Sequence, residues 1–180
     1  MKKLIILITL TIFNISKSQE YSPPTDLITI PTAGTLMRGS YSMDMRIQDA
    51  GGLILGLRTG ITDRFQFGLS FGSPNLIGDD SLIWYPRPEA NLKYLIINET
   101  ISLPAVAFGL NTQGLGSYND TLERYDTKAF GLYFSGSKNW TFALGNIGVH
   151  TGISYNFLEK LDEDTDPNLF FGLDLELNPE

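Results

Sequence analysis

The sequence has no cysteine among its 180 residues. This excludes a disulfide framework, a thiolate metal site and a cysteine nucleophile. It also excludes anchoring through an acylated N-terminal cysteine. A mean hydropathy of −0.02 leaves no room for a bundle of membrane helices. No glycine-rich phosphate loop, metal triad or pair of acids at glycosidase spacing is found, so the sequence indicates no enzyme, metal site or cofactor.

The first 18 residues have the pattern of a secretory signal peptide. Lys2 and Lys3 precede an apolar stretch over 4–15, and Ser16-Lys17-Ser18 offers a small-x-small cleavage site before Gln19. The alternative is the start of a buried helix. Removing the leader leaves 10 of the 13 basic residues against 20 acidic ones, a net charge of −10. We therefore expect an exported protein that does not bind nucleic acid.

The segment 52–72 predicts two strands joined by a tight turn at 62–64. Apolar residues alternate with Gly, Ser, Gln and Arg at period two, the period of a strand. One face of this hairpin is apolar and the other is roomy or polar. A soluble sandwich can have this pattern, and so can a barrel in a lipid bilayer that is apolar outside and polar inside.

The rest of the chain continues the pattern after an extended, proline-rich lead-in over 19–35. Together with the hairpin, strands are expected at 36–47, 53–61, 65–72, 90–97, 101–111, 127–137, 147–157 and 169–177. After the first turn, short connections alternate with long acidic and aromatic ones, as in outer-membrane barrels. The sequence thus predicts an all-β, antiparallel, up-and-down transmembrane barrel over 36–180. A soluble sandwich or periplasmic ligand-binding barrel is the alternative. Because Asn178-Pro179-Glu180 has residue types typical of a turn and directly follows a predicted strand, we expect further strands beyond residue 180.

Charged residues recur on the face opposite the apolar one, where they would either pair and plug the lumen or line a wider pore. Aromatic residues near strand ends suit the girdles at the membrane interface. The lumen candidates are Arg38, Asp44, Arg46, Arg58, Lys93, His150, Asp174 and Glu176, and the interface candidates are Trp84, Tyr85 and Trp140.

His150, the only histidine, shares its face with Ser154 and lies one strand from Asp174 and Glu176. A Ser, His and acid set suits a lipid-modifying barrel enzyme. Residues i and i+4 of a strand are about 13 Å apart, however, so His150 and Ser154 cannot exchange a proton. Polar filling of a barrel interior is the simpler interpretation. The acidic run 162–166 can likewise be read as a calcium site or as a solvated loop.

Four short motifs resemble the YjbH-like outer-membrane proteins, relatives of a component linked to exopolysaccharide production and export. They are Pro31-Thr32-Ala33-Gly34-Thr35-Leu36, Gly60-Ile61-Thr62-Asp63-Arg64-Phe65, Pro86-Arg87-Pro88 and Asp166-Pro167-Asn168. The resemblance covers most of 25–180 and is a pattern of turns, with no catalytic signature. It implies a Gram-negative outer-membrane location, further strands after residue 180 and a link to polysaccharide export.

We therefore expect an outer-membrane barrel with a structural, pore or export-accessory role. Its partners would be outer-membrane lipid, the barrel-assembly machinery and polysaccharide or other export components.

Overall fold

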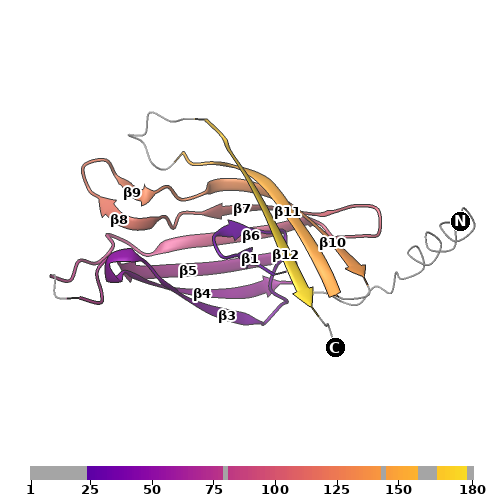
Figure 1. Ribbon diagram of the computed structural model, residues 1–180, viewed down its shortest axis with the longest axis horizontal. Helices are drawn as coiled ribbons and strands as arrows, with labels where there is room; N and C mark the ends of the chain where they lie inside the picture. Colours follow the sequence, from indigo (N-terminus) through magenta and orange to yellow (C-terminus); the bar gives the residue numbers. More distant parts are fainter. Residues whose placement is uncertain (1–23, 79–80, 143–144, 158–165, 178–180) are drawn as a thin grey trace, which may run out of the picture.

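The structure is a computed structural model that describes residues 24–78, 81–142, 145–157 and 166–177. Eight strands form one antiparallel sheet, curled into a half-barrel (Figure 1). In spatial order they are β12 (Asn168–Leu177), β11 (Gly145–Tyr155), β10 (Gly131–Phe142), β7 (Ala105–Asn111), β6 (Glu89–Ile97), β5 (Phe65–Ser73), β4 (Leu53–Thr62) and β3 (Tyr41–Ile47). The predicted all-β, up-and-down antiparallel architecture is confirmed.

The connections differ in length at the two ends of the sheet. At what we call the turn end, residues 63–64 join β4 to β5, and residues 98–104 join β6 to β7. At the opposite, loop end, the connections span 74–88, 112–130 and 156–167, and a short 3₁₀ turn (η1, Asp49–Gly51) lies between β3 and β4. The long connections lie on the left of Figure 1.

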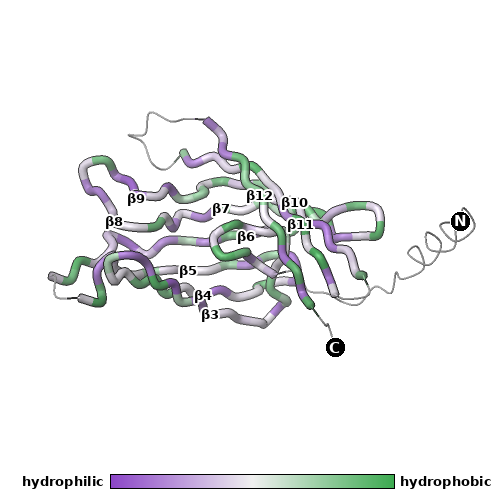
Figure 2. The backbone as a smooth tube through the Cα atoms, viewed as in Figure 1, coloured by the Kyte–Doolittle hydropathy of each residue, from purple (hydrophilic) through white to green (hydrophobic). Residues whose placement is uncertain are grey.

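Hydrophobic and hydrophilic residues alternate along the strands (Figure 2), and since successive side chains point to opposite faces, the two faces of the sheet have opposite chemistry. The convex face is apolar and exposed: Met43, Leu57 and Phe171 keep 74%, 60% and 59% of their surface. Among the eight described strands, Lys138 is the one Lys, Arg, Asp or Glu on this face, and its ammonium lies 3.0 Å from Glu99 Oε1 at the turn end. The concave face, here called the trough, carries Gly, Ser, Asn, Gln and charged residues.

Several strand limits differ from those predicted. β3 begins at Tyr41, after a turn at Gly39 (φ +78°), whereas the sequence pattern predicted a start at residue 36. β7 begins at Ala105 instead of 101, because Pro104 has no N–H to give the ladder. β10 starts at Gly131 (φ +65°) and runs to Phe142, since its register with β11 continues to the Phe142–Gly145 pair.

The predicted loop over 112–126 contains a hairpin that the sequence pattern did not reveal. β8 (Leu115–Asn119) pairs with β9 (Arg124–Thr127) in a separate two-stranded sheet at the loop end. Tyr125 packs with Tyr85 and with Ile54 of the trough. The hairpin therefore covers part of the open end of the trough.

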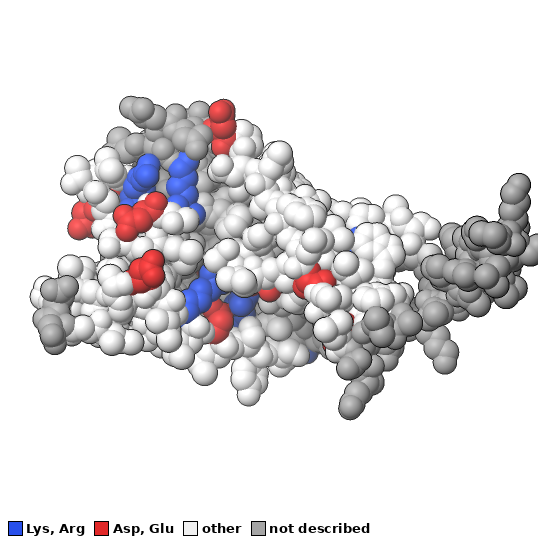
Figure 3. Space-filling view, viewed as in Figure 1, with Lys and Arg blue, Asp and Glu red and all other residues white. Residues whose placement is uncertain are grey.

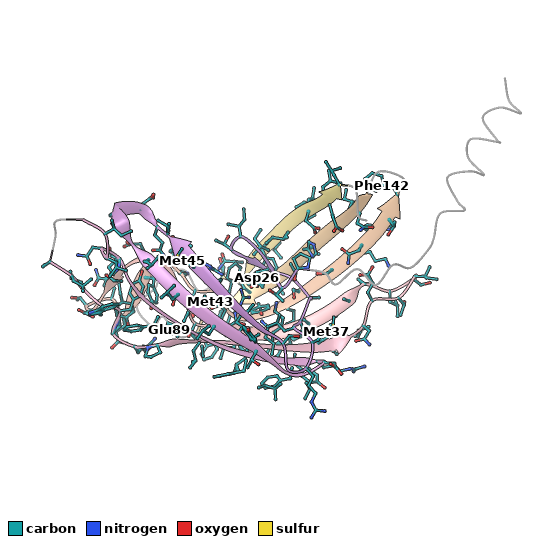
Figure 4. The ribbon with its side chains drawn as sticks, turned by 90° about the horizontal axis from the view of Figure 1, so that it is seen from below. Asp26, Met37, Met43, Met45, Glu89 and Phe142 are labelled. Atoms are coloured by element: carbon teal, nitrogen blue, oxygen red, sulfur yellow. The ribbon has the colours of Figure 1, made fainter. Side chains whose placement is uncertain are left out.

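The described part of the lead-in lies within the trough. Residues 24–36, here called the inner segment, include a second small sheet of β1 (Asp26–Leu27) and β2 (Ile30–Pro31), which is not hydrogen-bonded into the main sheet. Figure 4 shows Asp26 between the two rising sides of the half-barrel. Ala33 packs with Ala105 and Ala107 in a buried cluster. The sequence predicted the extended character of this segment but not its place.

An introduced cysteine pair would test this position, because the chain has no other thiol. Ala33→Cys combined with Ala105→Cys or Ala107→Cys should form a disulfide on mild oxidation, since the alanine side chains are in contact. The readout is mobility on a non-reducing gel.

The matched control is Ala33→Cys with Ala90→Cys, which places the second thiol on the convex face. Bridging in this control, or none in the two trough pairs, would contradict the placement of the inner segment.

Candidate functional site

Two cations lie at the floor of the trough, on β4 and β6, the strands on either side of β5. Arg58 of β4 pairs across the sheet with Gly68 of β5, and a Cβ at position 68 would lie 2.4 Å from Arg58 Cγ. The glycine therefore lets the arginine lie flat across the sheet. Lys93 of β6 is fully buried. A buried ammonium requires an anion or several acceptors, because desolvation disfavours its charge.

The inner segment supplies those acceptors. Asp26 forms an ion pair and hydrogen bond with Arg58 Nη1, and its Oδ1 lies 3.7 Å from Lys93 Nζ. The same ammonium donates to the carbonyl oxygens of Thr25 and Gly34, the latter at 3.1 Å. One aspartate and two carbonyls of the segment therefore neutralise and solvate the floor of the trough.

The charge network continues toward β3. Asp44 Oδ1 accepts from Arg58 Nη2 at 3.1 Å, and Asp44 Oδ2 lies 3.6 Å from Arg46 Nε. Figure 3 looks onto the trough and shows basic and acidic atoms side by side near its middle. Here the structure brings together five charged side chains, of which four were sequence candidates; Asp26 was not.

Beside this network lie buried polar groups without hydrogen-bond partners among the described residues. They are the Tyr133 hydroxyl, the Ser135 hydroxyl and the Gln66 amide nitrogen, each on a side chain at most 1% exposed. The Tyr133 ring covers Gly109, which is directly opposite Lys93 in the register. The floor of the trough therefore holds spare donors next to its two cations.

Two cavities lead from the loop end toward Arg58. The larger, about 310 Å³ and here called the vestibule, is lined in part by Thr29, Arg46, Asn111, Gln113 and Lys128. The smaller measures about 30 Å³ and adjoins Arg58, sharing Arg46, Asn111 and Gln113 with the vestibule. It has room for about two water molecules, so little free space remains beside Arg58.

A second group of polar residues links β10, β11 and β12. The Ala33 N–H donates to Ser137 Oγ at 2.8 Å, and Ser137 Oγ lies 2.7 Å from His150 Nδ1. On the other side of the ring, His150 Nε2 lies 2.5 Å from Asp174 Oδ1. Because an ionised carboxylate can only accept, the contact with Asp174 favours the ring proton on Nε2, and Nδ1 of the neutral ring then accepts from the Ser137 hydroxyl.

This chain has the residue types of a nucleophilic triad, but its surroundings favour a structural role. Ser137 and His150 are at most 1% exposed, and the serine oxygen accepts a hydrogen bond from the Ala33 N–H. Neither residue lines any of the cavities described above. The hydrogen bonds therefore fasten the inner segment to three strands of the half-barrel. Ser154, the other serine considered, lies on the same strand as His150 and is not its partner.

At the loop end, a cluster forms around Glu89, which is 2% exposed. Its carboxylate accepts from the Tyr125 hydroxyl at 3.1 Å and from Arg87 Nε at 3.1 Å. Burial is the largest cause that raises the pKa of Tyr125 above its usual value, and the negative charge of Glu89 is the next largest. Burial and Asp126 likewise raise the pKa of Tyr85 to about 12, and its hydroxyl donates to the Gly116 carbonyl. Both phenols stay neutral and tie the β8–β9 hairpin to the trough.

The remaining sequence candidates are dispersed. Arg38 is exposed in the turn before β3, so it is not in the lumen. Its backbone N–H donates a hydrogen bond to Asp63 Oδ1. Glu176 accepts from Asn146 Nδ2 on the concave face. Trp84 stacks on Phe71 and Trp140 is half exposed, whereas Tyr85 is buried and directed inward. The signal peptide and most of the acidic run 162–166 lie outside the described residues.

Comparisons with protein-family models, with curated proteins and with solved structures found no match to this chain. Within 24–78, 81–142, 145–157 and 166–177, no helix has the length and apolar character needed to cross a membrane. The same residues contain no group of three or more His, Cys, Asp or Glu side chains that could hold a metal ion.

Sequence reasoning missed Asp26, Ser137 and the buried amide and hydroxyl groups. The face of each lumen residue followed from the alternation, but the partner of each depended on the inner segment. A signal was present in the period-two pattern, since Ser137 lies within the predicted strand 127–137 and shares a face with Tyr133 and Ser135.

Replacing Ser137 tests the fastening role of this hydrogen-bond chain. Ser137→Ala should destabilise the fold by about 1–3 kcal/mol, because it leaves the buried Ala33 N–H and His150 Nδ1 unpaired. Ser135→Ala removes a buried hydroxyl without a partner from the same strand and should cost little or nothing. The measurement is the urea midpoint of unfolding in detergent, and equal midpoints for both variants would contradict the role.

Proposed function

We propose that this chain is exported and forms the wall of an outer-membrane β-barrel. The observation that carries the proposal is the pairing of an exposed, almost uncharged apolar convex face with a charged concave face. In water, a contiguous apolar surface across eight strands would be strongly unfavourable. Against lipid hydrocarbon it is the required surface, with the charges inside.

The two ends of the sheet support the same proposal. Short turns at one end and long loops at the other suit a barrel whose turn end faces the periplasm. Lys138, Trp140 and Phe142 lie on the convex face near the turn end, where amphipathic and aromatic side chains reach a membrane interface. Membrane lipid and the barrel-assembly machinery are the partners this requires.

Within that setting, the filled trough favours a structural or gated passage role over a permanently open pore. The inner segment neutralises the floor and leaves only a small cavity beside Arg58. We propose an accessory role in envelope or exopolysaccharide export, on the basis of the turn motifs and of this filled trough.

A second candidate function is a lipid-modifying barrel enzyme, because Ser137, His150 and Asp174 stand in hydrogen-bonded order. The buried position of Ser137 on the lumen side opposes this function. A fluorophosphonate probe, which labels activated serines, distinguishes the two. Labelling of the full chain that is lost in Ser137→Ala and His150→Ala would favour the enzyme.

Heat modifiability tests the membrane proposal. The chain is expressed with its signal peptide, alone and with any coding sequence that follows residue 180, and fractions are run on a denaturing gel with and without boiling. We expect the protein in the outer-membrane fraction, with a band that shifts on boiling because a closed barrel resists detergent. Recovery in the soluble periplasmic fraction without detergent would overturn the proposal in favour of a soluble β-protein.

A further inference from the structure

Asp26 is one of two carboxylates in the central charge network of the trough. Arg46, Arg58 and Lys93 provide three positive charges on the main sheet, against Asp44 in the same network. Asp26 belongs to the inner segment, which is not part of that sheet. If the segment leaves, Arg58 and Lys93 lose their shared carboxylate, and Asp44 alone remains against the three cations. The open trough would therefore attract another anion to that place.

Asp26 shows which chemistry fits. Its carboxylate lies between a guanidinium and an ammonium, the arrangement that suits carboxylates best. Tyr133, Ser135 and Gln66 add buried hydroxyl and amide groups that lack partners among the described residues. A ligand with one carboxylate and several hydroxyls would use both sets of groups.

A route to this position is already present. The vestibule is open at the loop end, and Arg46, Asn111 and Gln113 line both it and the small cavity that reaches Arg58. Cations and amides along this route suit an acidic saccharide chain better than an apolar ligand or a nucleotide base.

We infer that the trough is a binding site for a carboxylate-bearing saccharide, a hexuronate unit, whose carboxylate takes the place of Asp26 between Arg58 and Lys93. The inference rests on the proposed passage function and names the class of its cargo. The inner segment is then an internal competitor: it closes the trough, and an acidic saccharide displaces it by binding the open state more tightly.

The test measures binding of tri-galacturonate to the full chain refolded in detergent by titration calorimetry, with maltotriose as the neutral probe of equal length. Asp26→Asn should tighten tri-galacturonate binding about tenfold, because the competitor loses the charge that holds it. Arg58→Gln added to Asp26→Asn should abolish that gain. Glu176→Gln removes a trough carboxylate that bonds Asn146, away from the inner segment, and should bind like the parent chain.

A second measurement keeps Asp26, so its outcome does not depend on whether Asp26→Asn folds. Ala33 is 1% exposed, so a single Ala33→Cys in this cysteine-free chain should react slowly with a maleimide. Tri-galacturonate should accelerate the reaction severalfold, and maltotriose should not.

The inference is overturned if Asp26→Asn retains its gel shift on boiling but gains no affinity for tri-galacturonate. It is also overturned if maltotriose binds as tightly as tri-galacturonate, or if tri-galacturonate does not accelerate the labelling of Ala33→Cys. Loss of the gel shift in the parent chain is a different result, because it contradicts the barrel proposal itself. Binding of tri-galacturonate by a parent chain without that shift would retain the carboxylate site and reject the membrane setting.

Discussion

The structure depends on a buried ammonium. Lys93 lies at the centre of the concave face with no exposed surface, and water cannot reach its charge. The main sheet offers it Gly109 and Gln66 as cross-strand neighbours, neither of them an anion. Its three acceptors all come from residues 24–36. The inner segment is therefore a structural requirement of the closed state, and the electrostatics of the trough follow from where that segment lies.

The two faces of the sheet differ in chemistry, and this explains its composition. On the convex side, large apolar residues are exposed in seven of the eight strands and half-buried in β7, and the one charge pairs with Glu99 at the turn end. On the concave side, glycines at 68 and 109 make room for the Arg58 and Tyr133 side chains to lie across neighbouring strands. Small residues in the lumen and large ones outside are therefore parts of one pattern, set by the two-residue repeat of the strand.

Much of the fold could be predicted from the sequence, whereas the candidate site could be predicted only in part. Alternation placed Arg58, Lys93 and His150 on the inner face, because strand parity is a local property. The prolines at 23, 24 and 31 indicated an extended lead-in, but nothing local could show that it enters the trough, since its contacts are to β4, β6 and β10. The β8–β9 hairpin was missed for a similar reason: Tyr125 is held by Glu89 and Tyr85, which are distant in sequence.

The contact between Ala33 and Ser137 joins residues 104 positions apart, whereas every strand of the main sheet pairs with its nearest strand neighbour along the meander. Loop-closure entropy makes such distant contacts late events in folding. The inner segment precedes all eight strands in the chain and is thus among the last parts to reach its native position. Until β10 is in place, the segment carrying Asp26 has no complete surface to dock on, so local hairpins such as β4–β5 form before it docks.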